Sequence, residues 1–83
     1  MKTLYIISVV DLRGDFAEVE NSVYDDRIGA FVALQNEYNY YKSLQGFNAG
    51  ESWIERYDNE MEFYAEFDGT NKYIYGTINR VSL

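Results

Sequence analysis

The sequence predicts a single α+β domain in which one helix packs on one face of a mostly antiparallel sheet, with the element order ββαβββ. Sustained helical periodicity occurs in one segment, residues 24–46. The other segments alternate apolar and polar residues or are rich in β-branched and aromatic residues, with Gly, Asn and Asp between them. A chain of 83 residues without a linker or a repeat is expected to form one domain, residues 1–83.

The expected helix has an apolar stripe with helical spacing, formed by Ala30, Phe31, Leu34, Tyr38 and Tyr41. Asp25 is expected to cap its amino end, because a carboxylate there can accept hydrogen bonds from free backbone N–H groups. Asp26 adds negative charge that suits the helix dipole. Gly46 is expected to close the carboxyl end in a left-handed conformation. Tyr40 is expected to point away from the core.

Two strands are expected before the helix. Residues 3–10 are β-branched and aromatic on both faces, as in a central strand. Residues 12–15 form a turn in which Gly14 can take a positive φ. Residues 16–23 alternate, so the first two strands are expected to form a hairpin.

Three strands are expected after the helix, at residues 52–57, 60–67 and 72–81, with a tight turn at 68–71. The middle strand alternates most clearly. One of its faces carries Met61, Phe63, Ala65 and Phe67. The other face carries Glu60, Glu62, Tyr64 and Glu66.

A single helix can cover only one face of a five-stranded sheet. The open face is therefore expected to carry Tyr64 and its neighbouring glutamates. Depending on register, it also carries either the pair Tyr73 and Tyr75 or the pair Ile74 and Ile78. A face that mixes tyrosine with carboxylates has the composition of a docking surface.

Composition restricts the chemistry. The chain contains neither cysteine nor histidine, which removes disulfides, thiolate metal sites and the commonest general base. The acidic residues are not spaced as in a calcium loop, and the outward glutamates are expected to be solvated. We therefore expect no metal, no cofactor and no enzymatic activity. The apolar amino end, residues 3–10, is expected to be a strand and not a signal peptide, which favours a cytoplasmic protein.

The negative charge is unevenly distributed. The net charge of the chain is −7, and residues 11–26 and 51–68 carry nearly all of its acidic side chains. Such charge repels nucleic acid and anionic membranes and attracts a basic partner. Two interpretations remain open: the acids keep the protein soluble, or they imitate a phosphate backbone. Arg13-Gly14-Asp15 matches an adhesion tripeptide, but a hairpin turn explains it equally well.

In size, acidity, tyrosine content and lack of cysteine, the chain resembles small phage-encoded inhibitors of host defence, namely anti-CRISPR proteins and antirestriction DNA mimics. No family motif accompanies this resemblance. It implies that carboxylates would occupy a channel lined by Arg and Lys, in place of nucleic acid. The carboxylates in question are those of Glu55, Asp58, Glu60, Glu62 and Glu66.

The sequence thus favours a non-enzymatic inhibitor or binding protein that docks an acidic, tyrosine-rich surface on a basic site of a nucleic-acid-handling protein. The expected partner-binding residues are Glu51, Trp53, Glu55, Tyr57, Asp58, Glu60, Glu62, Tyr64 and Glu66. The alternative is a small structural module that forms a homodimer through open sheet faces or unprotected edge strands. Trp53 itself has two interpretations, as a core plug under the helix end or as a binding hot spot.

Overall fold

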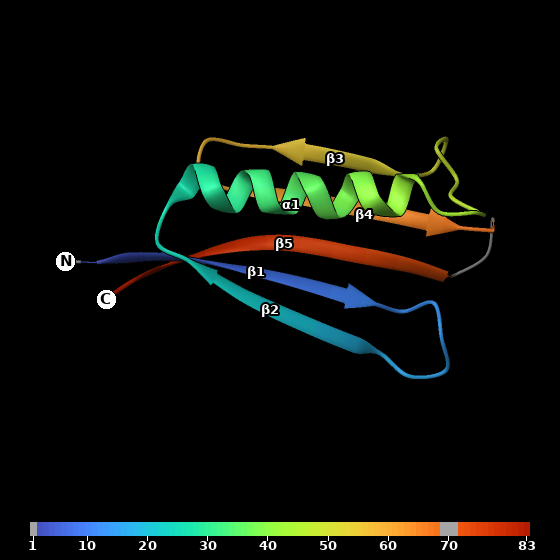
Figure 1. Ribbon diagram of the computed structural model, residues 1–83, viewed down its shortest axis with the longest axis horizontal. Coiled ribbons are helices and arrows are strands. Elements are labelled where there is room, and N and C mark those ends of the chain that lie inside the picture. The colour runs from blue at the N-terminus through green and yellow to red at the C-terminus, as the bar shows by residue number, and fades with distance from the viewer. Residues whose placement is uncertain (1, 69–71) are drawn as a thin grey trace.

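A computed structural model of the chain describes residues 2–68 and 72–83, in which it contains five strands and one helix (Figure 1). The elements are β1 (Thr3–Asp11), β2 (Glu18–Tyr24), α1 (Arg27–Lys42), β3 (Trp53–Arg56), β4 (Met61–Phe67) and β5 (Lys72–Ser82). The predicted order ββαβββ is confirmed. Of the turn expected at 68–71, residues 69–71 lie outside the described residues.

The strands form one sheet in the order β2-β1-β5-β4-β3, and each neighbouring pair is antiparallel. The expected hairpin of β1 and β2 is confirmed by a register that places Val10 opposite Val19. β5 lies at the centre of the sheet because it pairs with both β1 and β4. The two ends of the chain meet beside it, where Lys2 and Leu83 exchange backbone hydrogen bonds of 3.2 and 2.7 Å.

The helix begins one residue later than the sequence suggested. Asp26 is its N-cap, with an extended backbone and a carboxylate oxygen that accepts from the Gly29 N–H at 2.8 Å. The prediction of Asp25 as the cap is therefore wrong, because Asp26 is the residue whose side chain reaches the free N–H groups. The helix ends at Lys42. Gly46 does take a left-handed φ of 89°, but in the following loop and not at the helix end.

The core lies between α1 and one face of the sheet. All five residues of the predicted helical stripe and the predicted apolar face of β4 are buried. Phe63 lies at the centre of this core and is fully buried. Its ring centroid is 5.4 Å from that of Tyr38 and 6.1 Å from that of Tyr41. Gly76 lies opposite Phe63 on β5, and its lack of a side chain leaves room for this ring.

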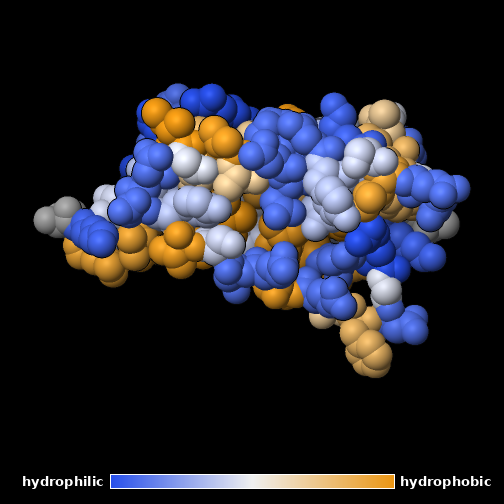
Figure 2. All heavy atoms as spheres, viewed as in Figure 1, coloured by the Kyte–Doolittle hydropathy of each residue, from blue (hydrophilic) through white to orange (hydrophobic). Residues whose placement is uncertain are grey.

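The helix leaves part of the sheet uncovered. In Figure 1, α1 lies on the side of β3, β4 and β5, whereas β2 extends beyond it at the edge of the sheet. Every residue of β2 is exposed except Tyr24, which is half-buried. Figure 2, in the same view, shows hydrophobic side chains reaching the surface among hydrophilic ones along the border where β1 and β2 lie.

Candidate protein-interaction site

The open face of the sheet is fixed by strand register, because residues paired across antiparallel strands share a face. Tyr64 on β4 lies opposite Trp53 on β3 and opposite Tyr75 on β5. Glu66 lies opposite Tyr73. The register therefore decides between the two expected pairs: Tyr73 and Tyr75 are on the open face, and Ile74 and Ile78 are buried under the helix.

Three rings form a row on this face. The Trp53 and Tyr64 rings stack with centroids 6.1 Å apart and an interplanar angle of 21°, and the Tyr64 and Tyr73 rings follow at 5.1 Å and 34°. The interpretation of Trp53 as a core plug is wrong, since its partner Tyr64 faces away from the helix. Trp53 is 38% exposed, so the row presents aromatic surface to the solvent.

Carboxylates flank the row, and tyrosine hydroxyls donate hydrogen bonds to two of them. Glu55 and Glu62 lie directly opposite each other on β3 and β4. The Tyr57 hydroxyl donates to Glu55, and the Tyr75 hydroxyl donates to Glu62 at 2.6 Å. The bond to Glu55 is the main cause that raises the pKa of Tyr57 to about 12, and the bond to Glu62 raises the pKa of Tyr75. Each carboxylate of this like-charged pair therefore has a fixed hydrogen-bond donor.

Tyr64 connects the rings to two more acids. Its pKa is raised, first by burial of the phenol against its neighbours and then by the negative charges of Glu66 and Glu51. Glu51 precedes β3 in the chain and Glu66 lies near the end of β4. The acidic groups thus act on the aromatic row from two separate segments.

A shallow hollow opens beside the row, with a volume of about 490 Å³. It is lined by Val10, Leu12, Tyr64, Tyr73 and Tyr75. The sequence-based site included only Tyr64 of these. Tyr73 and Tyr75 are two residues apart, so alternation puts both on one face of β5. Alternation does not say whether that is the face shared with Tyr64, because this depends on the pairing of β5 with β4.

We call the surface formed by Glu51, Trp53, Glu55, Glu62, Tyr64, Glu66, Tyr73 and Tyr75 the aromatic–acidic half of the open face.

The remaining predicted site residues lie at the turn between β3 and β4. Tyr57 N–H donates to the Glu60 carbonyl at 2.8 Å, and both residues line a small hollow with Glu62 at the end of the open face. The backbone carbonyl of Asp58 accepts from Arg27, at the helix start, at 3.3 Å. Asp58 lines a hollow at this turn together with Tyr57. Strand pairing, which places the predicted residues of β3 and β4 on the open face, does not extend to Asp58.

The other part of the open face is aliphatic. Over β1 and β2, the side chains that share this face include Ile6, Val10, Val19 and Val23, with Ile6 paired to Val23 and Val10 paired to Val19. Val19 and Val23 are 58% and 61% exposed. We call this surface the aliphatic half of the open face. The sequence-based site does not include it, because the alternation over residues 16–23 indicates a strand but not which of its faces stays uncovered.

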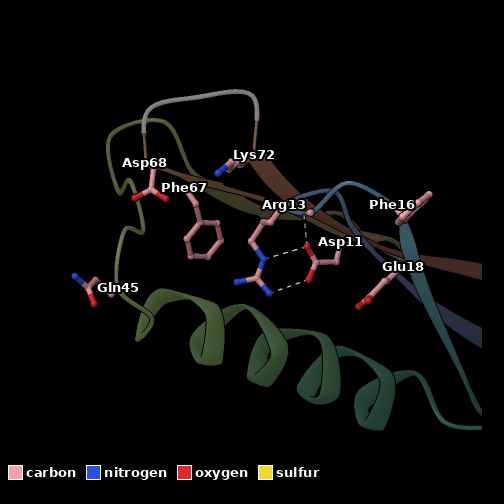
Figure 3. A pocket seen from close by; sticks show the side chains of 9 residues that line it. Asp11, Arg13, Phe16, Glu18, Gln45, Phe67, Asp68 and Lys72 are labelled. Carbon is pink, nitrogen blue, oxygen red and sulfur yellow. Dashed lines mark hydrogen bonds and ion pairs between the residues drawn. The ribbon is translucent and has the colours of Figure 1, made fainter.

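A further hollow, of about 390 Å³, lies on the helix side at the end of the sheet (Figure 3). Arg13 and Asp11 form a bidentate ion pair there, with bonds of 3.0 and 2.8 Å, which lowers the pKa of Asp11. The Arg13 guanidinium also lies 5.1 Å from the Phe67 ring centroid and 5.7 Å from that of Tyr41. These contacts hold the turn after β1 in place. A structural role therefore accounts for Asp11 and Arg13 in this hollow, and we do not treat it as a functional site. Figure 3 shows Phe16 pointing away from this pair.

The fold and this face define a class of protein: a small α+β domain that exposes an aromatic and acidic sheet face. Comparison with protein family models, with curated proteins and with solved structures found no match for this chain. Within residues 2–68 and 72–83, no helix is long and apolar enough to span a bilayer. In the same residues, no three acidic side chains gather as a metal site would require.

Proposed function

We propose that this protein is a non-enzymatic inhibitor that docks the aromatic–acidic half of its open face on a basic site of a nucleic-acid-handling protein, as phage anti-defence proteins of the anti-CRISPR or DNA-mimic kind do. The observation that carries the proposal is the row of Trp53, Tyr64 and Tyr73 with carboxylates on both sides of it. Large rigid rings and fixed charges are typical of binding hot spots.

The chemistry of this face suits arginine. A guanidinium group can stack on an exposed ring while its N–H groups donate to a nearby carboxylate. A cation over an aromatic face contributes about 0.5–2 kcal/mol, and more when water is excluded. Tyr64, with Glu66 and Glu51 near it, offers this combination, and the Trp53 ring stacked beside it extends the aromatic surface. A partner surface rich in Arg or Lys, such as a nucleic-acid channel, presents the complementary groups.

The arrangement of the acids favours docking over simple imitation of a phosphate row. Glu55 and Glu62 are adjacent across strands, whereas Glu62 and Glu66 are four residues apart, about 13 Å along the strand. Aromatic rings fill the space between them. The face therefore combines charge with planar apolar contact, which binds a protein surface in one orientation better than a uniform line of charges would.

A titration with a deca-arginine peptide, followed by Trp53 fluorescence, tests this proposal. Binding is expected to change the emission and to weaken as salt rises, because exposed charges are screened. The double variant Glu62→Lys/Glu66→Lys is expected to bind at least about tenfold more weakly than the unchanged protein.

The matched control is Glu18→Lys/Glu20→Lys, which changes the net charge equally but alters β2, where both side chains face away from the open face. This control is expected to retain most of the affinity. Equal loss in the two double variants would show that net charge alone attracts the peptide and would refute the docking face.

Inhibition is tested separately by DNA cleavage assays with RNA-guided nucleases and restriction endonucleases. The unchanged protein is expected to slow one of these enzymes, and Glu62→Lys/Glu66→Lys is expected to remove the effect. Peptide binding without inhibition of any enzyme in the panel would contradict the inhibitor role while leaving the docking chemistry in place.

A further inference from the structure

β2 is an edge strand with an unusual degree of exposure. It pairs with β1 on one side, and no strand of the described residues pairs with its other side. Both of its faces are open to solvent over nearly its whole length. The chain contains no proline, and the register with β1 runs without a bulge. An edge of this kind presents a row of backbone N–H and C=O groups that can pair with another strand.

Hydrophobic side chains gather at this edge. Val19 and Val23 are 58% and 61% exposed on the open face, whereas Phe16, two residues before the strand, is 84% exposed beside the helix-side hollow. The two valines continue the surface formed by Val10 and Ile6 on β1. Exposed apolar residues scattered singly need no explanation, but a contiguous group beside an unpaired strand edge is typical of an interaction surface.

We propose that β2 pairs in antiparallel fashion with β2 of a second copy of this chain, around a two-fold axis that passes through Asn21. The strand is self-complementary in this register. The pairs across the interface are Asn21 with Asn21, Glu20 with Ser22, Val19 with Val23 and Glu18 with Tyr24. No two carboxylates lie directly opposite each other, and each of the two exposed valines meets a valine of the second copy.

The same register makes the open faces of the two copies continuous. The Ser8 hydroxyl donates to the Asn21 side chain at 2.7 Å, so a polar row crosses the axis. Aliphatic rows flank it on both sides, each formed by Ile6 and Val23 of one copy and by Val19 and Val10 of the other. The aliphatic halves thus join at the centre of the assembly.

Other registers are less favourable. Placing Glu20 on the axis sets two carboxylates opposite each other. Placing Ser22 on the axis sets Val19 opposite Asp25 of the second copy. A shift of one residue would turn the side chains of one copy to the wrong face. Charge and polarity therefore select the register centred on Asn21.

The aromatic–acidic half lies over β3, β4 and β5, at the opposite edge of the sheet from β2. It stays uncovered in the paired state, so pairing of the two copies does not block the proposed docking surface. Two copies would present two such surfaces on the same side of a continuous sheet. Linked surfaces of this kind strengthen binding to a partner that can engage both.

Single cysteines test the register directly, because the chain has no cysteine of its own. In Asn21→Cys the two thiols would lie opposite each other, with Cα atoms about 4.5–5.5 Å apart, within disulfide range. In Val19→Cys they would lie four residues out of register, about 13 Å apart. Mild oxidation is expected to convert Asn21→Cys to a covalent dimer on a non-reducing gel and to leave Val19→Cys monomeric. Equal cross-linking of the two variants, or none of either, would overturn the proposal.

Sedimentation of the cysteine-free protein over a concentration range provides the second test. The unchanged chain is expected to show a reversible dimer. Ser22→Glu places a carboxylate opposite Glu20 at two symmetric positions and is expected to weaken the dimer about tenfold. Asn36→Glu makes the same charge change on the exposed side of α1 and is expected to have little effect. A strictly monomeric unchanged chain, or equal behaviour of the two variants, would contradict the proposal.

Discussion

Phe63 and Tyr64 are neighbours on β4, and the difference between them summarises the two faces of the sheet. Phe63 is fully buried and contacts the rings of Tyr38 and Tyr41 on the helix. Tyr64 is half-buried, and its contacts are Trp53 and Tyr73 on the neighbouring strands. Both residues are large and aromatic. Their position on alternate sides of the strand, and not their chemistry, decides which one stabilises the core and which one remains available for binding.

The two faces also differ in what raises the pKa of a tyrosine, even where the pKa reached is similar. The pKa of Tyr41 under the helix is raised to about 12, mainly by burial. The pKa of Tyr57 at the open face is raised to about 12 as well, but mainly by its hydrogen bond to Glu55. The core excludes water from a phenol, whereas the open face holds a phenol against a carboxylate. Only the second arrangement presents charge to a partner.

The largest effect is expected from Phe63→Ala. Removing this enclosed ring leaves a cavity beneath the helix and should cost about 3–5 kcal/mol of the free energy of unfolding. Tyr64→Ala on the opposite face should cost about 1 kcal/mol. Urea unfolding monitored by circular dichroism measures both values, and equal losses would contradict the division between the two faces.

A smaller loss of stability is expected from Gly76→Ala. An added Cβ would meet the Phe63 ring closer than van der Waals contact allows. Because the core is closely packed, the ring must shift, at a cost of about 1–3 kcal/mol. Thr77→Ala, at the next position of β5 and on the open face, is the control. A stabilising effect of Gly76→Ala in thermal unfolding would show that the core beneath the helix has spare volume.

Alkaline pH is expected to destabilise the fold through both faces. A tyrosine with a raised pKa binds its proton more tightly in the folded state, so its contribution is complete below about pH 10 and is lost as pH rises toward 12. Tyr41→Phe should reduce this pH dependence more than Tyr57→Phe, because Tyr57 is exposed and its charge interactions are screened by solvent. Urea midpoints measured from about pH 8 to about pH 11 give the comparison. The opposite order would contradict the assigned causes.

The helix start offers a pair of neighbouring residues with different expected effects. Asp26→Ala removes the hydrogen bond to the Gly29 N–H and should cost about 1 kcal/mol. Asp25→Ala removes an equal charge without removing the cap and should change stability by a few tenths of a kcal/mol. Thermal unfolding of the two variants measures the difference, and a larger loss from Asp25→Ala would restore the cap that the sequence suggested.

Asp25 and Asp26 also show which features of the fold could be predicted from the sequence and which could not. The helix, the buried face of β4 and the order ββαβββ were predictable, because apolar spacing over many residues defines them. The choice between Asp25 and Asp26 was not, since either residue type can cap and only the backbone conformation separates them. The end of the helix was similarly ambiguous. A glycine in a left-handed conformation can end a helix, but Gly46 takes that conformation in the loop that follows Lys42.

The candidate site was predictable in part. Glu62, Tyr64 and Glu66 followed from the alternation of β4 alone. The tyrosines of β5 did not, because Tyr73 and Ile74 are both large and apolar enough for either face. Trp53 was ambiguous for a related reason: β3 is too short for alternation to assign a face. These positions were decided by pairing between strands, which is a long-range property of the sheet.

The most direct test of the account is the stability of Trp53→Ala measured with no partner present. If Trp53 belongs to the open face, urea unfolding by circular dichroism should show a loss of about 1 kcal/mol or less. Binding of deca-arginine by the same variant, followed by calorimetry, should weaken by about tenfold or more. A loss of stability of about 3 kcal/mol or more, as for a buried aromatic residue, with unchanged peptide binding would contradict the account.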